Sequence, residues 1–274
     1  MPADPAIADV LRWLAANAVP GFFVSLSVVL VAVATITRSV ARFGAVRGHP
    51  RWEGVPLLAL RFDLGFALIV AAGLIFAGIA GEIGVGEAVG RLDVIFSDAL
   101  RGSTSPAVLR AFDAVTRFGD PLTLTVLCAV VAVVLVVRRE RWLALAWVIA
   151  IAGNGILNRT LKAEFERVRP LHPEGHVLAD GWSFPSGHSS GALVAYGMLA
   201  YVLIRLAPDA WRMPAVLLAA AIAFATGCSR VFLQVHYATD VMAGFASGAA
   251  WLAICIGTVE ATRLYRGRRR RQDA

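Results

Sequence analysis

The apolar residues of this chain lie in long uncharged blocks rather than in short alternating runs. A helix needs roughly 20 predominantly apolar residues, with about 17 as the lower end, to cross the hydrocarbon core of a bilayer. Seven blocks reach that length: 19–37, 64–80, 121–137, 142–158, 188–204, 213–229 and 237–257. The pattern therefore predicts an all-α fold, a polytopic membrane helical bundle of about seven transmembrane helices.

Two segments have features besides apolar length that bear on their structure, the stretch 81–120 and the block 19–37. The stretch 81–120 has apolar residues at helical spacing, such as Leu92, Ile95 and Phe96, but it carries too many charges to span a membrane. We expect it to lie along the membrane surface or to cap the bundle. The block 19–37 follows an acidic start, is longer than the apolar region of a signal peptide and lacks its basic leader, so we interpret it as a retained helix.

Composition supports a membrane protein. The chain is 58% hydrophobic and only 16% charged, against about 25% charged residues in a typical soluble domain. The net charge of +7 does not predict nucleic-acid binding, because no nucleic-acid-binding motif accompanies the arginines, which cluster in short connections between the blocks. The three cysteines lie inside apolar blocks and are interpreted as core residues, not as a disulfide framework or a metal cluster.

Basic residues also predict the orientation of the helices. Arginine-rich connections follow the first, third, fifth and seventh blocks, so all of them can be cytoplasmic at once. The N-terminus and the connections 81–120, 162–187 and 230–236 then face the outside. We divide the chain into three parts: an N-terminal helix with its basic cytoplasmic connection (1–61), a helical core (62–258) and a basic cytoplasmic tail (259–274).

Polar residues that could carry chemistry fall in three clusters, all on the predicted outer side. The first contains Lys162, the only lysine of the chain, and Arg169. An ordinary interfacial cation is the alternative interpretation of Lys162. The second contains Pro185, Ser186 and His188, at the start of an apolar block, where the unpaired N–H groups of a helix N-terminus can bind an anion. A plain helix cap followed by an interfacial histidine is the alternative.

The third cluster contains Arg230, His236 and Asp240, all of which interrupt apolar sequence. His236 and Asp240 are four residues apart, so on a helix they share one face. A carboxylate in that position could fix the imidazole tautomer. Ionisable groups cost about 2.5–3.5 kcal/mol each at the centre of a membrane and usually face a cavity or a partner. A buried ion pair between two helices is the alternative.

Together the clusters predict a site for a phosphate monoester or diphosphate. Lys162, Arg169 and Arg230 would supply positive charge, and the N–H groups of Ser186 and Gly187 would add hydrogen bonds. Two histidines would divide the roles of nucleophile and general acid, but the residues alone do not decide which is which. Nothing resembles a carboxylate cage for magnesium, so we expect no metal and no cofactor.

His172 and His176 have proline and glycine between them and are interpreted as loop residues near the substrate entrance.

The pattern K-x6-RP, PSGH and SR-x5-H-x3-D resembles the signature of the type 2 phosphatidic acid phosphatase superfamily, which also includes the vanadium haloperoxidases. Every position of that signature is filled: Lys162, Arg169, Pro170, Pro185, Ser186, Gly187, His188, Ser229, Arg230, His236 and Asp240. The resemblance covers about 64–257, and it implies a six-helix phosphatase core plus one N-terminal helix.

The resemblance also implies a role for each of the site residues. His236 would be the nucleophile that becomes phosphorylated, Asp240 would orient it, and His188 would protonate the leaving group. The phosphate would be bound by Lys162, Arg169, Ser186, Gly187 and Arg230, without a metal.

These expectations predict an integral membrane phosphatase of the bacterial cytoplasmic membrane, with its active site outside and its C-terminus in the cytoplasm. Its partners would be the bilayer and a membrane lipid substrate, not a nucleic acid. An undecaprenyl diphosphate-type carrier is favoured, and phosphatidylglycerophosphate or phosphatidic acid comes next. Two alternatives remain open: a lipid phosphotransferase, and a non-catalytic membrane transporter or lipid-binding protein. A soluble haloperoxidase is excluded by the seven blocks. The oligomeric state is not predicted.

Overall fold

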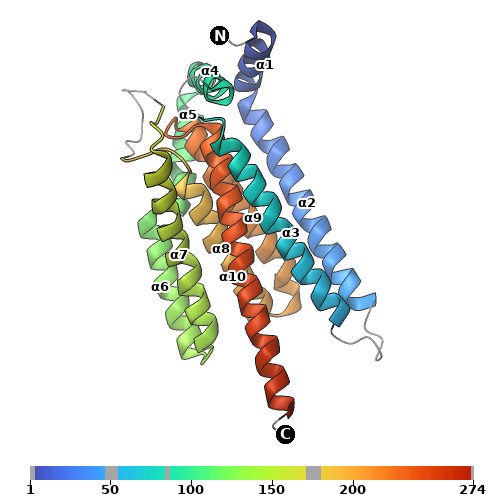
Figure 1. Ribbon diagram of the computed structural model, residues 1–274. Coiled ribbons are helices and arrows are strands. Elements are labelled where there is room, and N and C mark those ends of the chain that lie inside the picture. Colours follow the sequence, from blue (N-terminus) through green and yellow to red (C-terminus); the bar gives the residue numbers. More distant parts are fainter. Residues whose placement is uncertain (1–3, 47–54, 84–86, 171–179, 273–274) are drawn as a thin grey trace.

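The computed structural model describes residues 4–46, 55–83, 87–170 and 180–272, which form a bundle of helices (Figure 1). Within those ranges the secondary structure is helical, without strands. The elements are α1 (Pro5–Ala16), α2 (Ala18–Val46), α3 (Val55–Ala80), α4 (Ala88–Ser103), α5 (Pro106–Thr116), the short 3-10 helix η1 (Arg117–Gly119), α6 (Pro121–Val137), α7 (Arg141–Phe165), α8 (Gly187–Leu206), the 3-10 helix η2 (Asp209–Trp211), α9 (Arg212–Phe232) and α10 (Ala238–Gln272).

Six stretches of the described chain are long and apolar enough to cross a membrane, and they lie in α2, α3, α7, α8, α9 and α10. A seventh crossing is formed if α5 and α6 are counted together, because α6 has only 17 residues and α5–η1 joins it at a bend of 42°. The prediction of an all-α membrane bundle is therefore confirmed, with six spans, or seven when this bent pair is counted as one.

The segment between α3 and α6 divides into two helices with different positions. α4 lies across one end of the bundle, as expected of a capping helix, and α1 packs against it (Figure 1). α5 packs on α9 and leads directly into α6. The short helix α1 was not predicted by the apolar blocks. It begins at Pro5, and the side chain of Asp4 caps it by accepting a hydrogen bond from the Ala6 N–H.

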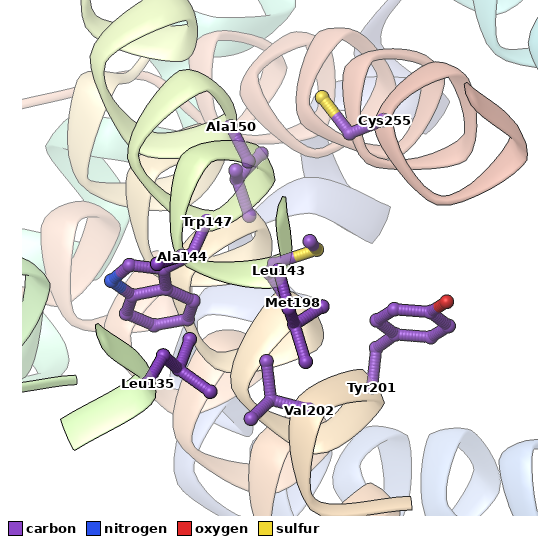
Figure 2. Packing of buried hydrophobic residues seen from close by; sticks show 10 residues of the cluster. Leu135, Leu143, Ala144, Trp147, Ala150, Met198, Tyr201, Val202 and Cys255 are labelled. Carbon is purple, nitrogen blue, oxygen red and sulfur yellow. The ribbon is translucent and has the colours of Figure 1, made fainter. Parts of the chain in front are cut away.

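The largest buried cluster lies between α6, α7, α8 and α10 (Figure 2). Trp147 is fully buried there, and its indole N–H donates to the carbonyl oxygen of Cys128 at 2.9 Å. Cys255 packs in the same cluster, and all three cysteines are free thiols, as the sequence predicts. Small residues allow the helices to approach closely: a Cβ on Gly244 of α10 would lie 2.6 Å from the carbonyl oxygen of Ser186. The beginnings of α8 and α10 are therefore in direct contact.

Helix termini bring the three polar clusters to one end of the bundle. α7 ends at Phe165, where Glu166 adopts a left-handed conformation with φ 44°. α8 begins after Ser186, whose hydroxyl oxygen accepts a hydrogen bond from the Ser189 N–H at 3.4 Å. α9 ends at Phe232 and α10 begins six residues later. Since consecutive spans run in opposite directions, the ends of α7 and α9 lie beside the beginnings of α8 and α10 (Figure 1).

Candidate active site

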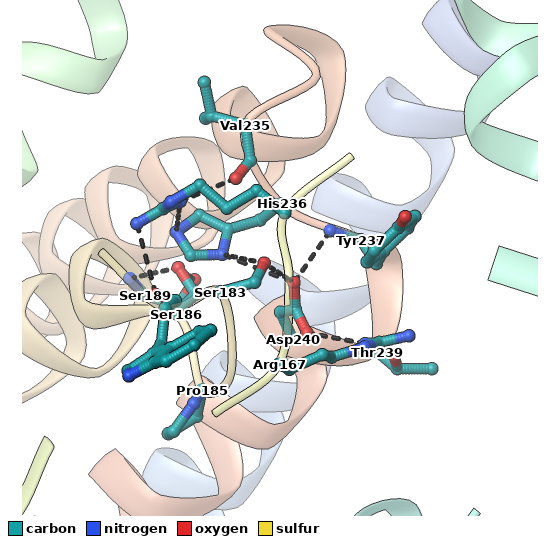
Figure 3. Close-up of polar contacts among 12 residues, drawn as sticks. Arg167, Ser183, Pro185, Ser186, Ser189, Val235, His236, Tyr237, Thr239 and Asp240 are labelled. Carbon is teal, nitrogen blue, oxygen red and sulfur yellow. Dashed lines mark hydrogen bonds and ion pairs between the residues drawn. The ribbon is translucent and has the colours of Figure 1, made fainter. Parts of the chain in front are cut away.

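His236 lies in the loop between α9 and α10, and only 2% of it is exposed. Its Nδ1 is 3.4 Å from Oδ2 of Asp240 (Figure 3), and its Nε2 is 3.0 Å from Nη1 of Arg169. A guanidinium can only donate, so Nε2 must accept and the ring proton must be on Nδ1, directed at Asp240. Burial and the charges of Arg169 and Arg230 outweigh Asp240 and lower the pKa of His236 to about 3. The imidazole is therefore neutral at neutral pH, with its lone pair on Nε2.

Asp240 is fully buried in the first turn of α10, and its carboxylate is held by several donors. Oδ2 accepts from the Ser183 hydroxyl at 2.5 Å and from the Tyr237 N–H at 2.9 Å, and Oδ1 accepts from Nη1 of Arg167 at 2.6 Å (Figure 3). The bond to Tyr237 also caps α10, because that residue directly precedes the helix. These bonds fix the carboxylate in one orientation toward His236.

Arg167 is a site residue that the sequence did not single out. Its Nη2 is 2.9 Å from Oδ2 of Asp93 in α4, so one guanidinium bridges Asp93 and Asp240. Its charge also lies 4.4 Å above the centre of the Tyr237 ring. Burial disfavours the charged guanidinium, but Asp240 and Asp93 outweigh burial and raise the pKa of Arg167. Asp93 in turn accepts hydrogen bonds from the Thr239 N–H and hydroxyl, which attaches the capping helix α4 to the beginning of α10.

Lys162 and Arg169 are held by neutral carbonyl oxygens rather than by carboxylates. Lys162, in the last turn of α7, donates to the carbonyl oxygens of Trp182 and Ser183. Arg169 donates to the carbonyl oxygen of Val235 at 2.7 Å and to three carbonyl oxygens of residues 180–182. Burial lowers the pKa of Arg169, although the group stays charged at neutral pH because a guanidinium titrates far above that range.

Arg230 completes the cluster of cations. Its Nη1 donates to the hydroxyl of Thr116 at 2.7 Å, and its buried Nε has no hydrogen-bond partner among the described residues. Arg230 and Arg169 each interact electrostatically with Lys162. None of the ion pairs within the described ranges includes any of these three cations. Arg230 is buried and Lys162 and Arg169 are partly buried. Because cations removed from water are costly unless an anion accompanies them, the cluster has the properties of an anion-binding site.

His188 has the opposite proton arrangement from His236. It lies in the first turn of α8, and its Nε2 is 2.9 Å from Oδ1 of Asp120, the residue that precedes α6. An ionised carboxylate only accepts, so this Nε2 carries a proton. Gly119 lies against the ring, since a Cβ there would be 2.9 Å from Cδ2 of His188 and 2.5 Å from Cγ2 of Thr226. One histidine therefore presents a lone pair and the other a proton.

The structure corrects one expectation about Ser186. Its backbone N–H, predicted to bind an anion, donates instead to the carbonyl oxygen of Asp240 at 2.9 Å, because α8 and α10 begin in direct contact. The Ser186 hydroxyl oxygen accepts a hydrogen bond from the Ser189 hydroxyl at 2.9 Å. The hydroxyl hydrogen of Ser186 can therefore be donated to a bound ligand. Gly187 follows in the first turn of α8, and a Cβ there would lie 2.9 Å from Oδ1 of Asn158. His172 and His176 lie outside the described residues.

Comparison with known proteins identifies the family. The PAP2 superfamily matches residues 141–263. Phosphatidylglycerophosphatase B of Bacillus subtilis (strain 168) is 31% identical over 183 residues, which are 66% of this chain and 89% of that protein. This chain belongs to the PAP2 superfamily.

A solved structure supports the same relationship. The crystal structure of the first transmembrane PAP2 type phosphatidylglycerolphosphate phosphatase, from Bacillus subtilis, matches with a TM-score of 0.66 and 30% identity. The match covers 70% of this chain and 96% of that one. The PAP2 protein described here is therefore a membrane phosphatase that acts on lipid phosphates. Its family match begins at residue 141, so the partners that α4, α5 and the start of α6 contribute, Asp93, Thr116 and Asp120, lie outside the matched region.

Proposed function

We propose that this PAP2 phosphatase hydrolyses its lipid substrate through a phosphohistidine formed on His236. The observation that carries the proposal is the arrangement of two buried histidines around one cation cluster. Nε2 of His236 presents a lone pair beside Arg169, whereas Nε2 of His188 carries a proton. The free lone pair is what a nucleophile needs, and the Asp120 carboxylate beside Nε2 would stabilise the imidazolium form in which His188 acts as a general acid.

The reaction would proceed in two steps. Nε2 of His236 attacks phosphorus, the bond between phosphorus and the lipid oxygen breaks, and the imidazolium of His188 gives a proton to that oxygen and becomes neutral. Water then attacks phosphorus and gives one proton to the neutral His188, while the bond between phosphorus and Nε2 of His236 breaks. Phosphate is released and both histidines return to their starting states. The Nδ1 proton of His236 stays shared with Asp240 throughout, and this stabilises the positive charge that the ring acquires.

The phosphoryl oxygens would be bound by charge and by two hydrogen-bond donors. Lys162, Arg169 and Arg230 provide positive charge where negative charge develops in the transition state. The Ser186 hydroxyl and the Gly187 N–H would donate to the same oxygens, since N–H groups in the first turn of a helix have no acceptor within the helix. No step requires a metal.

The first substrate to test is phosphatidylglycerophosphate. The sequence favoured an undecaprenyl diphosphate-type carrier, but the matched protein and the matched structure, both from Bacillus subtilis, carry the name of a phosphatidylglycerophosphate phosphatase. We therefore rank this lipid first, undecaprenyl diphosphate second and phosphatidic acid third. The enzyme would act in the bacterial cytoplasmic membrane with its site on the outer side.

Phosphate release by the detergent-purified protein, with excess EDTA and each of these lipids, tests the proposal. We expect turnover with EDTA present, complete loss in His236→Ala, and a loss of about 10²–10⁴-fold in His188→Ala, as for other general acids. Each variant must elute as a folded protein with an unchanged unfolding temperature. A near-normal rate in either variant would contradict the mechanism.

The same assay separates the alternatives. A phosphotransferase would produce lipid alcohol without an equal amount of free phosphate, because the phosphoryl group would pass to another acceptor. A transporter or lipid-binding protein would produce neither. Quenching at alkaline pH after mixing with radiolabelled substrate should place the label on His236, and label on another residue would exclude His236 as the nucleophile.

A further inference from the structure

A groove lies at the end of the bundle opposite to the candidate active site. α7, α8 and α10 enclose a volume of about 820 Å³ there, which is within the roughly 300–1,000 Å³ of ligand pockets. Its lining comes from the beginning of α7, the end of α8 and residues 251–266 of α10, whereas the catalytic candidates lie at or beyond the other end of each helix. The groove is therefore separate from the candidate active site.

The walls of the groove are apolar and face the surroundings of the bundle. Leu145 and Ile149 of α7 lie on one side, and Ile254 of α10 lies on the other. Half of the Leu145 and Ile149 surfaces and 43% of the Ile254 surface are exposed. In a membrane-spanning segment such surfaces contact acyl chains, so a lipid has direct access to the groove.

The mouth of the groove is basic. Arg266 lies with its guanidinium 3.7 Å from the centre of the Trp142 ring, and neither the hydrogen bonds nor the ion pairs found within the described ranges pair it with a carboxylate. Arg205 and Arg263 share the single carboxylate of Glu260, each at 3.1 Å. The Tyr201 hydroxyl donates to that carboxylate as well, at 2.5 Å.

Positive charge is therefore in excess at the mouth. Three guanidiniums line the groove, those of Arg205, Arg263 and Arg266. The nearby carboxylates are Glu140, which also lines the groove, and Glu260, which Arg205 and Arg263 share. Glu140 is exposed at the beginning of α7, where solvent screens it. Trp142 lies beside Arg266 at this rim, and tryptophan is enriched at the membrane–water interface.

We propose that this groove is a binding site for a phospholipid with an anionic headgroup. One acyl chain lies along the apolar walls, and the phosphate lies at the rim, where Arg266 and Arg263 donate to its oxygens. A zwitterionic lipid fits less well, because its ammonium group would approach the same arginines. The site is independent of the catalytic proposal, since none of the catalytic candidates lines it.

Native mass spectrometry of the detergent-purified full chain tests this site. Phosphatidylglycerol and phosphatidylcholine with identical acyl chains are added separately, and the bound fraction of each is measured. We expect several-fold more phosphatidylglycerol to remain bound, and we expect Arg266→Gln to remove that preference. Arg138→Gln is the matched control, because it removes an exposed arginine from the same end of the bundle without altering the groove. Equal binding of both lipids, or equal effects of the two substitutions, would overturn the proposal.

Two further variants locate the lipid. Ala146→Phe adds a ring inside the groove and should reduce binding of both lipids. Arg230→Gln alters the candidate active site and should leave the preference for phosphatidylglycerol intact. Loss of that preference in Arg230→Gln together with its retention in Arg266→Gln would place the anionic lipid in the active site and overturn the proposal. The unfolding temperature of each variant shows whether its fold is retained.

Discussion

Arg167 and Arg169 are two residues apart and have different partners. Arg167 is paired with two carboxylates, and Arg169 contacts carbonyl oxygens and the imidazole of His236. The charge of Arg167 is thus neutralised by two carboxylates of the protein. The charge of Arg169 is not neutralised by a carboxylate among the described residues and can attract an anion. We infer that Arg167 positions Asp240, and through it His236, without contacting the substrate.

Substitution of Arg167 tests this positioning role. Arg167→Gln removes the charge beside Asp240, and we expect kcat to fall about 10- to 100-fold, the range seen for partners that orient histidines in metal sites. KM should change little. The uncompensated carboxylate should also raise the pKa of His236 from about 3, so the acid limb of the kcat/KM profile should move to higher pH.

The controls distinguish positioning from a general loss of structure. Arg167→Lys retains the charge and should recover part of kcat, while Arg169→Gln should raise KM. A damaged fold would lower kcat in both Arg167 variants alike and leave the pH profile unchanged, and that result would contradict the positioning role.

Motif spacing revealed the residues of the candidate site that lie close together in sequence, but not the distant residues that hold them. His236 and Asp240 were predicted to share a face because four residues separate them. Arg167 could not be distinguished from the other charges of its segment, and Asp93 meets it only through the fold, 74 residues away. Ser183 is a serine in a connecting segment, for which the sequence offers no signal. The Ser186 N–H was predicted to bind an anion, because the sequence does not reveal the contact between α8 and α10 in which this N–H donates to the carbonyl oxygen of Asp240.

At the scale of elements, the connection between α5 and α6 controls the position of His188. Gly119 ends η1, and its missing side chain leaves room for the His188 ring and the Thr226 methyl group. Asp120, the next residue, holds Nε2 of His188. This short connection therefore sets both the distance and the hydrogen bond of the proposed acid.

Gly119→Ala should displace His188 and lower kcat at least about 10-fold, with a stability loss of about 1–3 kcal/mol typical of overpacking. Turnover and the unfolding temperature are the measurements. Gly102→Ala is the control, because a Cβ on Gly102 would have no neighbour within 4 Å. Unchanged turnover in Gly119→Ala would mean that the ring position is not set by this contact.

Long apolar blocks predicted helices well, because a block of bilayer length leaves the backbone no alternative to internal hydrogen bonds. The seven blocks correspond to α2, α3 and α6–α10. Their ends were less accurate, since α7 continues to Phe165 and α10 to Gln272, so the predicted tail 259–274 is helical through Gln272. α1 was missed because it is short and amphipathic, and its burial depends on contacts with α4 that no local pattern reveals.

For the whole molecule, the candidate active site and the arginine-rimmed groove occupy opposite ends of the same helices. Arginine counts predict that the groove end is cytoplasmic. The packing of α3 against α10, and of α2 against α9, could not be predicted, because a lipid-facing helix is apolar on every side.

Cysteine labelling in intact cells tests the orientation. After replacement of Cys128, Cys228 and Cys255 by alanine, Glu164→Cys marks the active-site end and Asp209→Cys marks the opposite end; both positions are exposed. We expect a membrane-impermeant maleimide to label only Glu164→Cys until the membrane is permeabilised. Labelling of Asp209→Cys alone would reverse the orientation.

Lys162, Arg169 and Arg230 have no carboxylate among the ion pairs of the described residues. Under the proposed mechanism the reaction ends with inorganic phosphate beside them. A cluster that attracts the phosphate of a lipid also retains the phosphate that hydrolysis produces. Product release would then limit turnover, and free phosphate on the active-site side of the membrane would act as a competitive inhibitor. The rate of such an enzyme would report the phosphate supply of its surroundings as well as the amount of its lipid substrate.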